Sequence, residues 1–177
     1  IRGLGSGTTL IFKPDATIFK EGIKLDYSAL KRQLKELAYL SPGLIFHLQF
    51  EDEPELTIIS ENGIKDYIKD LNQEKNKLTS VFYTENMEDR IGVKIAMQYN
   101  DTYTDVYKLY TNSIPNSAGT HLTGFRTALT STINDYARDN KLLKEKDANI
   151  SGDELKEGLV LVLSFIMPDP VFSGQTK

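Results

Sequence analysis

The sequence contains no cysteine and no tryptophan, and it has only two histidines among its 177 residues. Without cysteine the chain can form neither a disulfide nor a thiolate metal site. His47 and His121 stand alone in the sequence, so they suggest no metal cluster either. No apolar run approaches the roughly 18 residues of a membrane span, and we expect no contact with a membrane.

The first residues, "IRGLGSGTT", also lack the features of a targeting segment. They contain no Met and no apolar core, so they do not form a secretion signal. No strand precedes the glycines and no Gly-Lys-Ser/Thr follows them, which makes them a poor match to a phosphate loop. We interpret them as a linker inside a longer protein, and we expect that protein to be cytoplasmic.

Charge and composition exclude one class of nucleic-acid binder. The chain is 40% hydrophobic and 26% charged, with a formal net charge of −4. This composition is ordinary for a globular domain, and the length fits one domain or one domain with a piece of another. A negative net charge argues against a protein that coats nucleic acid, so any DNA contact would have to come from a local patch.

Local patterns predict an α+β fold in which one sheet is backed by two or three helices. A cap at Asp26 and apolar residues at helical spacing predict the first helix, and an alternating run after Pro42 predicts a hairpin. A long helix after Gly119 is predicted to place Phe125, Leu129, Ile133 and Tyr136 on one stripe. The predicted strands cover residues 8–13, 44–50, 55–60, 91–99 and about 103–114, with helices at 27–40, 63–71 and 120–138 and a short turn at 151–158. Residues 159–167 are apolar on both faces, which predicts a central strand.

Four stretches, in this order and spacing, resemble the ATPase subunit of type IIA DNA topoisomerases, the family of DNA gyrase B and the E-type subunit of topoisomerase IV. "GTTLIFKPD" resembles the last strand of that family's nucleotide-binding domain, and "AGTHLTGFRTALTSTIND" resembles its transducer helix. "SGDELKEGL" is similar to a family pattern with a second Asp and an Arg, and "PDPVFSGQTK" resembles the end of the transducer with its QTK loop. These stretches are residues 7–15, 118–135, 151–159 and 168–177.

The resemblance implies a fold that the local patterns do not give. It implies a ribosomal-protein-S5-domain-2-like transducer with a mixed sheet and a left-handed βαβ crossover, an exception to the usual hand. Residues 1–15 would be the last strand of an upstream GHKL ATP-binding domain and its linker, and residues 16–177 would be the transducer. The catalytic Glu, the Mg²⁺-binding Asn and the lid of the family have no counterpart in these residues, so we expect the chain alone to be inactive.

The resemblance also implies three ATP contacts. Lys177 would be the catalytic cation that contacts the terminal phosphate of ATP, where a preorganised charge stabilises the developing negative charge. Gln175 would be a second donor on the same loop, and Thr8 would help to bind the adenine side of the nucleotide. Without the resemblance, Lys177 would be interpreted as a solvated tail residue and Thr8 as an ordinary strand residue.

One further residue would contact DNA. Arg126 matches a family arginine that faces the cavity enclosed by the dimer, and it would hold a phosphate without reading sequence; the alternative is a surface arginine with a partner on its own helix. We assign no role to His121. The acidic turn at residues 51–53 and the mixed-charge stretch at residues 141–147 are interpreted as solvated connections, with no metal site.

The sequence therefore predicts part of an ATP-hydrolysing type II DNA topoisomerase. Its expected cofactors are ATP and Mg²⁺, and its expected partners are double-stranded DNA, the DNA-cleaving A-type subunit and a second copy of the ATPase subunit. Two alternatives stay open: the S5-like domain of a mismatch-repair or chaperone ATPase, and an RNA-binding module without enzymatic activity. The patterns do not separate gyrase from topoisomerase IV.

Overall fold

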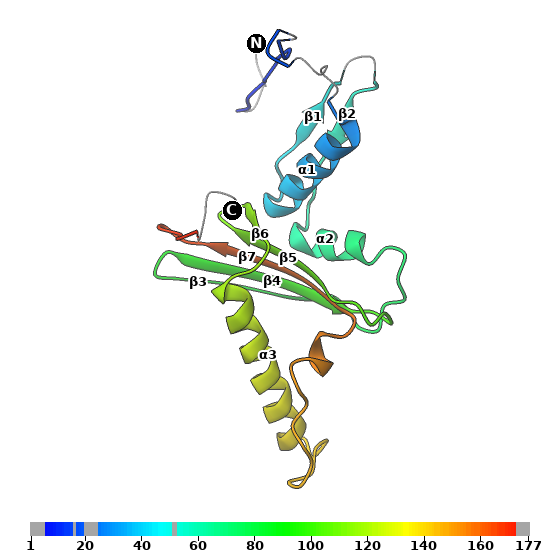
Figure 1. The fold of residues 1–177 in the computed structure, drawn as a ribbon, viewed down its shortest axis with the longest axis vertical. Coiled ribbons are helices and arrows are strands. Elements are labelled where there is room, and N and C mark those ends of the chain that lie inside the picture. The colour runs from blue at the N-terminus through cyan, green and yellow to red at the C-terminus, as the bar shows by residue number, and fades with distance from the viewer. Residues whose placement is uncertain (1–5, 16, 20–24, 51–52, 173–177) are drawn as a thin grey trace.

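The computed structural model describes residues 6–15, 17–19, 25–50 and 53–172. In these residues a five-stranded sheet has helices on both faces, and a separate two-stranded hairpin lies beside the first helix (Figure 1). The helices are α1 (Tyr27–Leu40), α2 (Ile64–Leu71) and α3 (Thr120–Asp139), with a 3₁₀ turn η1 (Glu154–Lys156). The strands are β1 (Phe46–Leu48), β2 (Leu56–Ile58), β3 (Phe82–Glu88), β4 (Ile91–Tyr99), β5 (Val106–Thr111), β6 (Ile114–Asn116) and β7 (Leu159–Ile166).

The five-stranded sheet has the order β3-β4-β7-β5-β6. Strand β7 pairs antiparallel with β4 and parallel with β5, so the sheet is mixed. The chain passes from β5 through β6 and α3 before it enters β7, which makes this connection a crossover around α3. The predicted α+β class with helices behind a mixed sheet is confirmed, whereas the left hand of the crossover stays a prediction.

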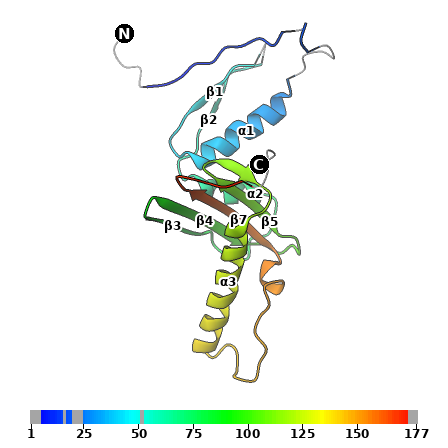
Figure 2. The ribbon, with the colours of Figure 1, turned by 60° about the vertical axis from the view of Figure 1, so that its left-hand side comes forward.

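The two faces of β7 form two separate cores. Val160 and Val162 pack with residues of α1, α2 and β4 on one face. Leu161 and Leu163 pack under α3 on the other face, together with Leu109 of β5. All four β7 residues are at most 1% exposed, so the prediction of a central strand that is buried on both sides is confirmed. Helix α2 covers one of these faces and the first half of α3 covers the other, whereas α1 lies against α2 and the β1–β2 hairpin (Figures 1 and 2).

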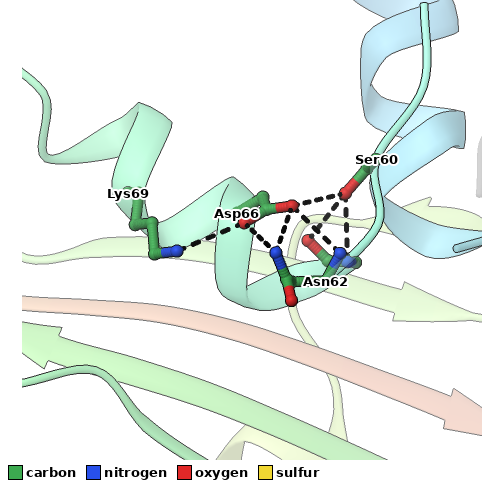
Figure 3. A network of polar contacts seen from close by, with 5 residues as sticks. Ser60, Asn62, Asp66 and Lys69 are labelled. Atoms are coloured by element: carbon green, nitrogen blue, oxygen red, sulfur yellow. Dashed lines mark hydrogen bonds and ion pairs between the residues drawn. The ribbon is translucent and has the colours of Figure 1, made fainter.

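A polar network fixes the start of α2 (Figure 3). The carboxylate of Asp66 accepts hydrogen bonds from Ser60 Oγ at 3.0 Å, from the backbone and side chain of Asn62, and from Lys69 Nζ at 3.4 Å. Burial disfavours the charged form of Asp66, but these hydrogen bonds outweigh it and hold its pKa below the ordinary value. Gly63 precedes the helix with φ 59°, and a Cβ there would lie 2.7 Å from Pro42 Cγ. Glycine is therefore required at this cap.

Buried amides connect the ends of several elements. Asn72 Nδ2 donates to Gln98 Oε1 at 2.9 Å, and Asn100 Nδ2 donates to Asn72 Oδ1 at 2.9 Å. Gln98 Nε2 in turn donates to the Thr79 carbonyl at 2.8 Å. All three amide residues are at most 5% exposed. The network ties the end of α2 to the end of β4 and to the segment before β3, because a buried amide is tolerated only when it is hydrogen-bonded.

Three sequence-based expectations about elements are wrong in detail, and one strand is missing from them. Residues 8–13 form no strand, and Leu10 and Ile11 in that stretch are 80% and 90% exposed. The sequence patterns do not predict strand β3, although it pairs with β4 along its whole length. The predicted strand after Asn100 is the β5–β6 hairpin, with a turn at Asn112 and Ser113. On α3, Tyr136 is 62% exposed, and Asn134 and Ala137 are buried in its place.

Candidate functional site

Helix α3 holds Arg126 at the edge of its apolar stripe. Leu122, Phe125 and Leu129 pack against the sheet residues on this face, which leaves the adjacent position 126 beside the loop that leads into β7. The side chain of Arg126 is 41% exposed. The expected helical placement of Arg126 is therefore confirmed, and the guanidinium is available at the surface.

Two residues from the loop before β7 join Arg126 in a charge cluster. Asp153 Oδ1 lies 3.6 Å from Arg126 Nη2 and 2.9 Å from Lys156 Nζ, so one carboxylate oxygen contacts both cations. The hydrogen bond from Lys156 is the main cause of a lowered pKa of Asp153, and the charge of Arg126 adds to it. The side chain of Asp153 is 80% exposed, compared with 38% for Lys156. The cluster is thus a cation pair bridged by a solvated carboxylate.

The loop is held against α3 by a two-way amide contact. Asn134 Nδ2 donates to the Ile150 carbonyl at 2.9 Å, and Ile150 N donates to Asn134 Oδ1 at 2.8 Å. After it, Ser151 and Glu154 cap the η1 turn reciprocally, with Ser151 N donating to Glu154 Oε2 at 2.7 Å. These bonds explain why Asn134 is buried on α3 and why Asp153 and Lys156 reach Arg126.

An open groove of about 510 Å³ lies between α3 and this loop. Its lining includes the side chain of Arg126, several hydroxyl and amide side chains, one carboxylate and a larger share of apolar surface. The lining residues are Arg126, Thr127, Thr130, Ser131, Asn134, Asp135, Asn149, Ile150 and Gly152. Several of the polar side chains in this lining are already hydrogen-bonded within the chain, since Thr130 Oγ1 donates to the Arg126 carbonyl and Ser131 Oγ donates to Asp135. In the part of the chain that the structure describes, no cluster of histidines and carboxylates could hold a metal ion.

A small cavity lies beneath the charge cluster. It measures about 10 Å³ and is lined by Tyr107, Arg126, Leu129, Lys156 and other residues of α3 and the loop. The Tyr107 hydroxyl is buried and has no hydrogen-bond partner among the described residues. Burial is the main cause that raises the pKa of Tyr107 to about 12. Arg126 and Lys156 thus line one common cavity.

The start of the C-terminal tail is fixed at the opposite end of β7. Asn112 adopts φ 50°, and its side chain donates to the Met167 carbonyl and accepts from Met167 N, both at 2.9 Å. Its backbone N donates to the Phe165 carbonyl at 2.8 Å. The turn after β5 thus holds the chain where it leaves the sheet. Gln175 and Lys177 lie outside the described residues.

The other predicted residues stand apart from the charge cluster. Thr8 is exposed in an extended segment, and that segment lies on the opposite side of the sheet from α3 (Figures 1 and 2). His121 is half-buried near the start of α3, with its ring 5.7 Å from the Phe165 ring and a pKa that burial lowers. Residue 53 of the acidic turn is exposed, and residues 51–52 lie outside the described residues.

The fold matches solved ATPase structures of type II topoisomerases. The 43K ATPase domain of Thermus thermophilus gyrase B, solved with an aminocoumarin, superposes with a TM-score of 0.80 at 32% identity, over 92% of this chain and 45% of that chain. The topoisomerase IV ATP-binding domain of Francisella tularensis, solved with a small-molecule inhibitor, gives a TM-score of 0.72 at 26% identity, over 89% and 42%. The class of fold is therefore that of these ATPase domains.

Sequence comparison gives the family. A family model described as DNA gyrase B matches residues 63–177. The DNA gyrase B protein of Streptococcus pyogenes serotype M1 is 41% identical across 97% of this chain, and that of Clostridium acetobutylicum is 40% identical across the same share. The chain belongs to the DNA gyrase B family. It spans 27% of the length of both relatives.

Sequence reasoning missed three residues that the site depends on. Asp153 and Lys156 fall inside a stretch that resembles the family, but nothing in their local pattern indicates a contact with α3. The local pattern predicts Asn112 only as part of a strand. Its positive φ and its contact with Met167 depend on the pairing of β5 with β7, which the local sequence does not encode.

Proposed function

We propose that residues 16–177 are the transducer of the ATPase subunit of a type II DNA topoisomerase, and that residues 1–15 belong with an upstream ATP-binding domain. The observation that carries this proposal is the course of β7. The strand lies in the middle of the sheet, pairs with both β4 and β5, and continues directly into the tail that ends in Gln175 and Lys177. A force on the tail would therefore act on the core of the domain.

In the proposed mechanism the tail reports the state of the nucleotide. Lys177 would contact the terminal phosphate, Gln175 would add a donor, and Thr8 would contact the adenine side. Loss of the terminal phosphate would remove the partner of Lys177 and release the tail, so that the domain could rotate as a ligand-biased hinge. Asn112 would keep the base of the tail in place during this change, because it holds Met167 by two hydrogen bonds.

ATP would be bound together with Mg²⁺. By the resemblance to the family, the ligands of Mg²⁺ would lie in the upstream ATP-binding domain. The chain's own contribution is the placement of the tail cation. In the whole protein, nucleotide binding would hold two subunits closed around a DNA segment, and the A-type subunit would cleave the DNA.

Arg126 is proposed to contact the backbone of that DNA segment. Its side chain is 41% exposed on α3, where it is part of the lining of an open groove. A guanidinium holds a phosphate without reading the base sequence. This agrees with a protein whose net charge of −4 gives no general attraction to DNA. Membership of the gyrase B family argues against the mismatch-repair, chaperone and RNA-binding alternatives.

The test is Arg126→Gln in the full-length ATPase subunit, reconstituted with the A-type subunit. DNA stimulation of ATP turnover should weaken while basal turnover stays near the wild-type rate. The slope of the logarithm of DNA affinity against the logarithm of salt concentration should become shallower by about one, because one phosphate contact is lost. Arg32→Gln is the matched control, since Arg32 is exposed on α1. Equal loss of basal and stimulated turnover would show that Arg126 supports folding or coupling and does not contact DNA.

A further inference from the structure

The contact of Asp153 with both Arg126 and Lys156 has the form of a bound anion. One carboxylate oxygen lies within 3.6 Å of the guanidinium and 2.9 Å of the ammonium. A phosphate oxygen bound by an Arg and a Lys would take a similar place. The carboxylate belongs to the chain itself, and its loop is fixed to α3 by Asn134.

We propose that Arg126 and Lys156 form a two-cation site for a backbone phosphate of DNA, and that Asp153 occupies this site as an internal counter-ion which the phosphate displaces. The proposal rests on the proposed function and adds to it a second cation and a competitor. It makes DNA binding by this face an exchange of one anion for another. The exchange would keep the affinity of this face for DNA in solution low. The contact would then form mainly with DNA that the dimer already encloses.

The side chains of Arg126 and Lys156 are partly buried, whereas the side chain of Asp153 is largely exposed. Arg126 and Lys156 line one small cavity together with Leu129 and Leu159. Their side chains are 41% and 38% exposed, as is usual for long cationic side chains that bury part of their apolar length. Asp153 is 80% exposed and makes no cap for the η1 turn. Exposed ion pairs contribute little to stability, because water and salt screen them. A phosphate can therefore replace Asp153 at little cost, and the loop does not depend on it.

The other carboxylates near the site have different partners. Glu154 accepts from Ser151 N and Ser151 Oγ, both at 2.7 Å, so it is used in the cap of η1. Asp135 lines the groove and accepts from Ser131 Oγ at 3.3 Å. Asp153 is thus the carboxylate that directly contacts both cations among the described residues. Its removal is expected to convert a neutralised pair into a cationic site.

The experiment measures binding of the full-length ATPase subunit to a labelled 40-base-pair duplex by fluorescence anisotropy, over a series of salt concentrations. Asp153→Asn should tighten binding about three- to fivefold relative to Asp139→Asn, which is the scale of one surface ion pair. Asp139 is the matched control, because it is exposed at the end of α3 and its replacement changes the net charge equally. Lys156→Gln and Arg126→Gln should each weaken binding and make the salt slope shallower by about one.

The site is tested by combining the variants. The increase in DNA affinity caused by Asp153→Asn should be absent when Arg126→Gln and Lys156→Gln are both present, because no cation is then left for Asp153 to neutralise. The counter-ion proposal is wrong if Asp153→Asn and Asp139→Asn bind DNA with equal affinity. It is also wrong if Asp153→Asn still increases DNA affinity in the combined variant.

The controls also separate this proposal from the proposed function. If Arg126→Gln and Lys156→Gln bind DNA no more weakly than the exposed controls Arg32→Gln and Lys146→Gln, this face does not contact DNA, and the assignment of Arg126 fails as well. If Arg126→Gln alone weakens binding, the DNA contact stands and the two-cation site is wrong.

Discussion

Replacement of Asn72 by Ala is expected to destabilise the domain strongly, although Asn72 lies far from any proposed ligand. The side chain of Asn72 donates to Gln98 and accepts from Asn100, both at 2.9 Å. In the variant, Gln98 Oε1 and Asn100 Nδ2 would each lose this partner while buried, since the two residues are 5% and 2% exposed. Each buried group left unsatisfied costs about 1–3 kcal/mol.

The expected loss of unfolding free energy is about 2–4 kcal/mol, because partial relaxation and water entry reduce the sum of the two penalties. At an m-value of about 2 kcal/mol per M, the urea midpoint should fall by roughly 1–2 M. Urea unfolding of the 177-residue chain, followed by far-ultraviolet circular dichroism, measures this change. Asn76→Ala is the control, since Asn76 is exposed nearby and its replacement should change stability by less than about 0.5 kcal/mol. A loss below about 1 kcal/mol for Asn72→Ala would refute the reasoning, because the amides would then have found other partners.

Two other perturbations have defined outcomes. The pKa of Asp66 is lowered in the folded state, so its hydrogen bonds stabilise the domain above the ordinary Asp pKa of about 3.9 and cease to do so as the pH falls below it. Unfolding free energy measured from pH 7 to pH 2 should therefore fall less steeply below about pH 4 in Asp66→Asn than in the wild type; parallel curves would contradict this. Lys177→Ala in the full-length ATPase subunit should keep nucleotide binding but lower single-turnover ATP hydrolysis by about 10²–10³-fold, and Lys177→Arg should rescue it poorly. A rate within about twofold of wild type would remove Lys177 from the mechanism.

Local signals in the sequence were sufficient for the helices and for the central strand. Asp26 caps α1 as predicted, its side chain accepting from Ala29 N at 3.0 Å. Strand β7 is apolar at consecutive positions because both of its faces are covered, and this pattern is visible without a structure. These elements depend on residues that are neighbours in sequence, which is the information that pattern analysis uses.

Elements that depend on distant partners could not be predicted in this way. Strand β3 lies at the sheet edge with mostly exposed residues and is defined by its pairing with β4. Residues 8–13 have the composition of a strand but pair with nothing among the described residues. On α3 the buried stripe is turned toward Asn134, because the loop at Ile150 bonds to it. The proximity of Arg126 and Lys156 depends on the same loop contact, so it could not be predicted from the sequence.

The position of β7 has a consequence for how the protein comes to be folded. Strand β7 comes last among the described strands, yet it is the middle strand of the sheet and contributes residues to both cores. Until it has been synthesised, the β3–β4 and β5–β6 hairpins lack a common neighbour, and their inner edges are open to pairing with other chains. Contacts between such distant segments also make folding slow. During translation, the ribosome must therefore release almost the entire described chain before either core can close, and the segment that completes the fold is the one that continues into the proposed nucleotide-sensing tail.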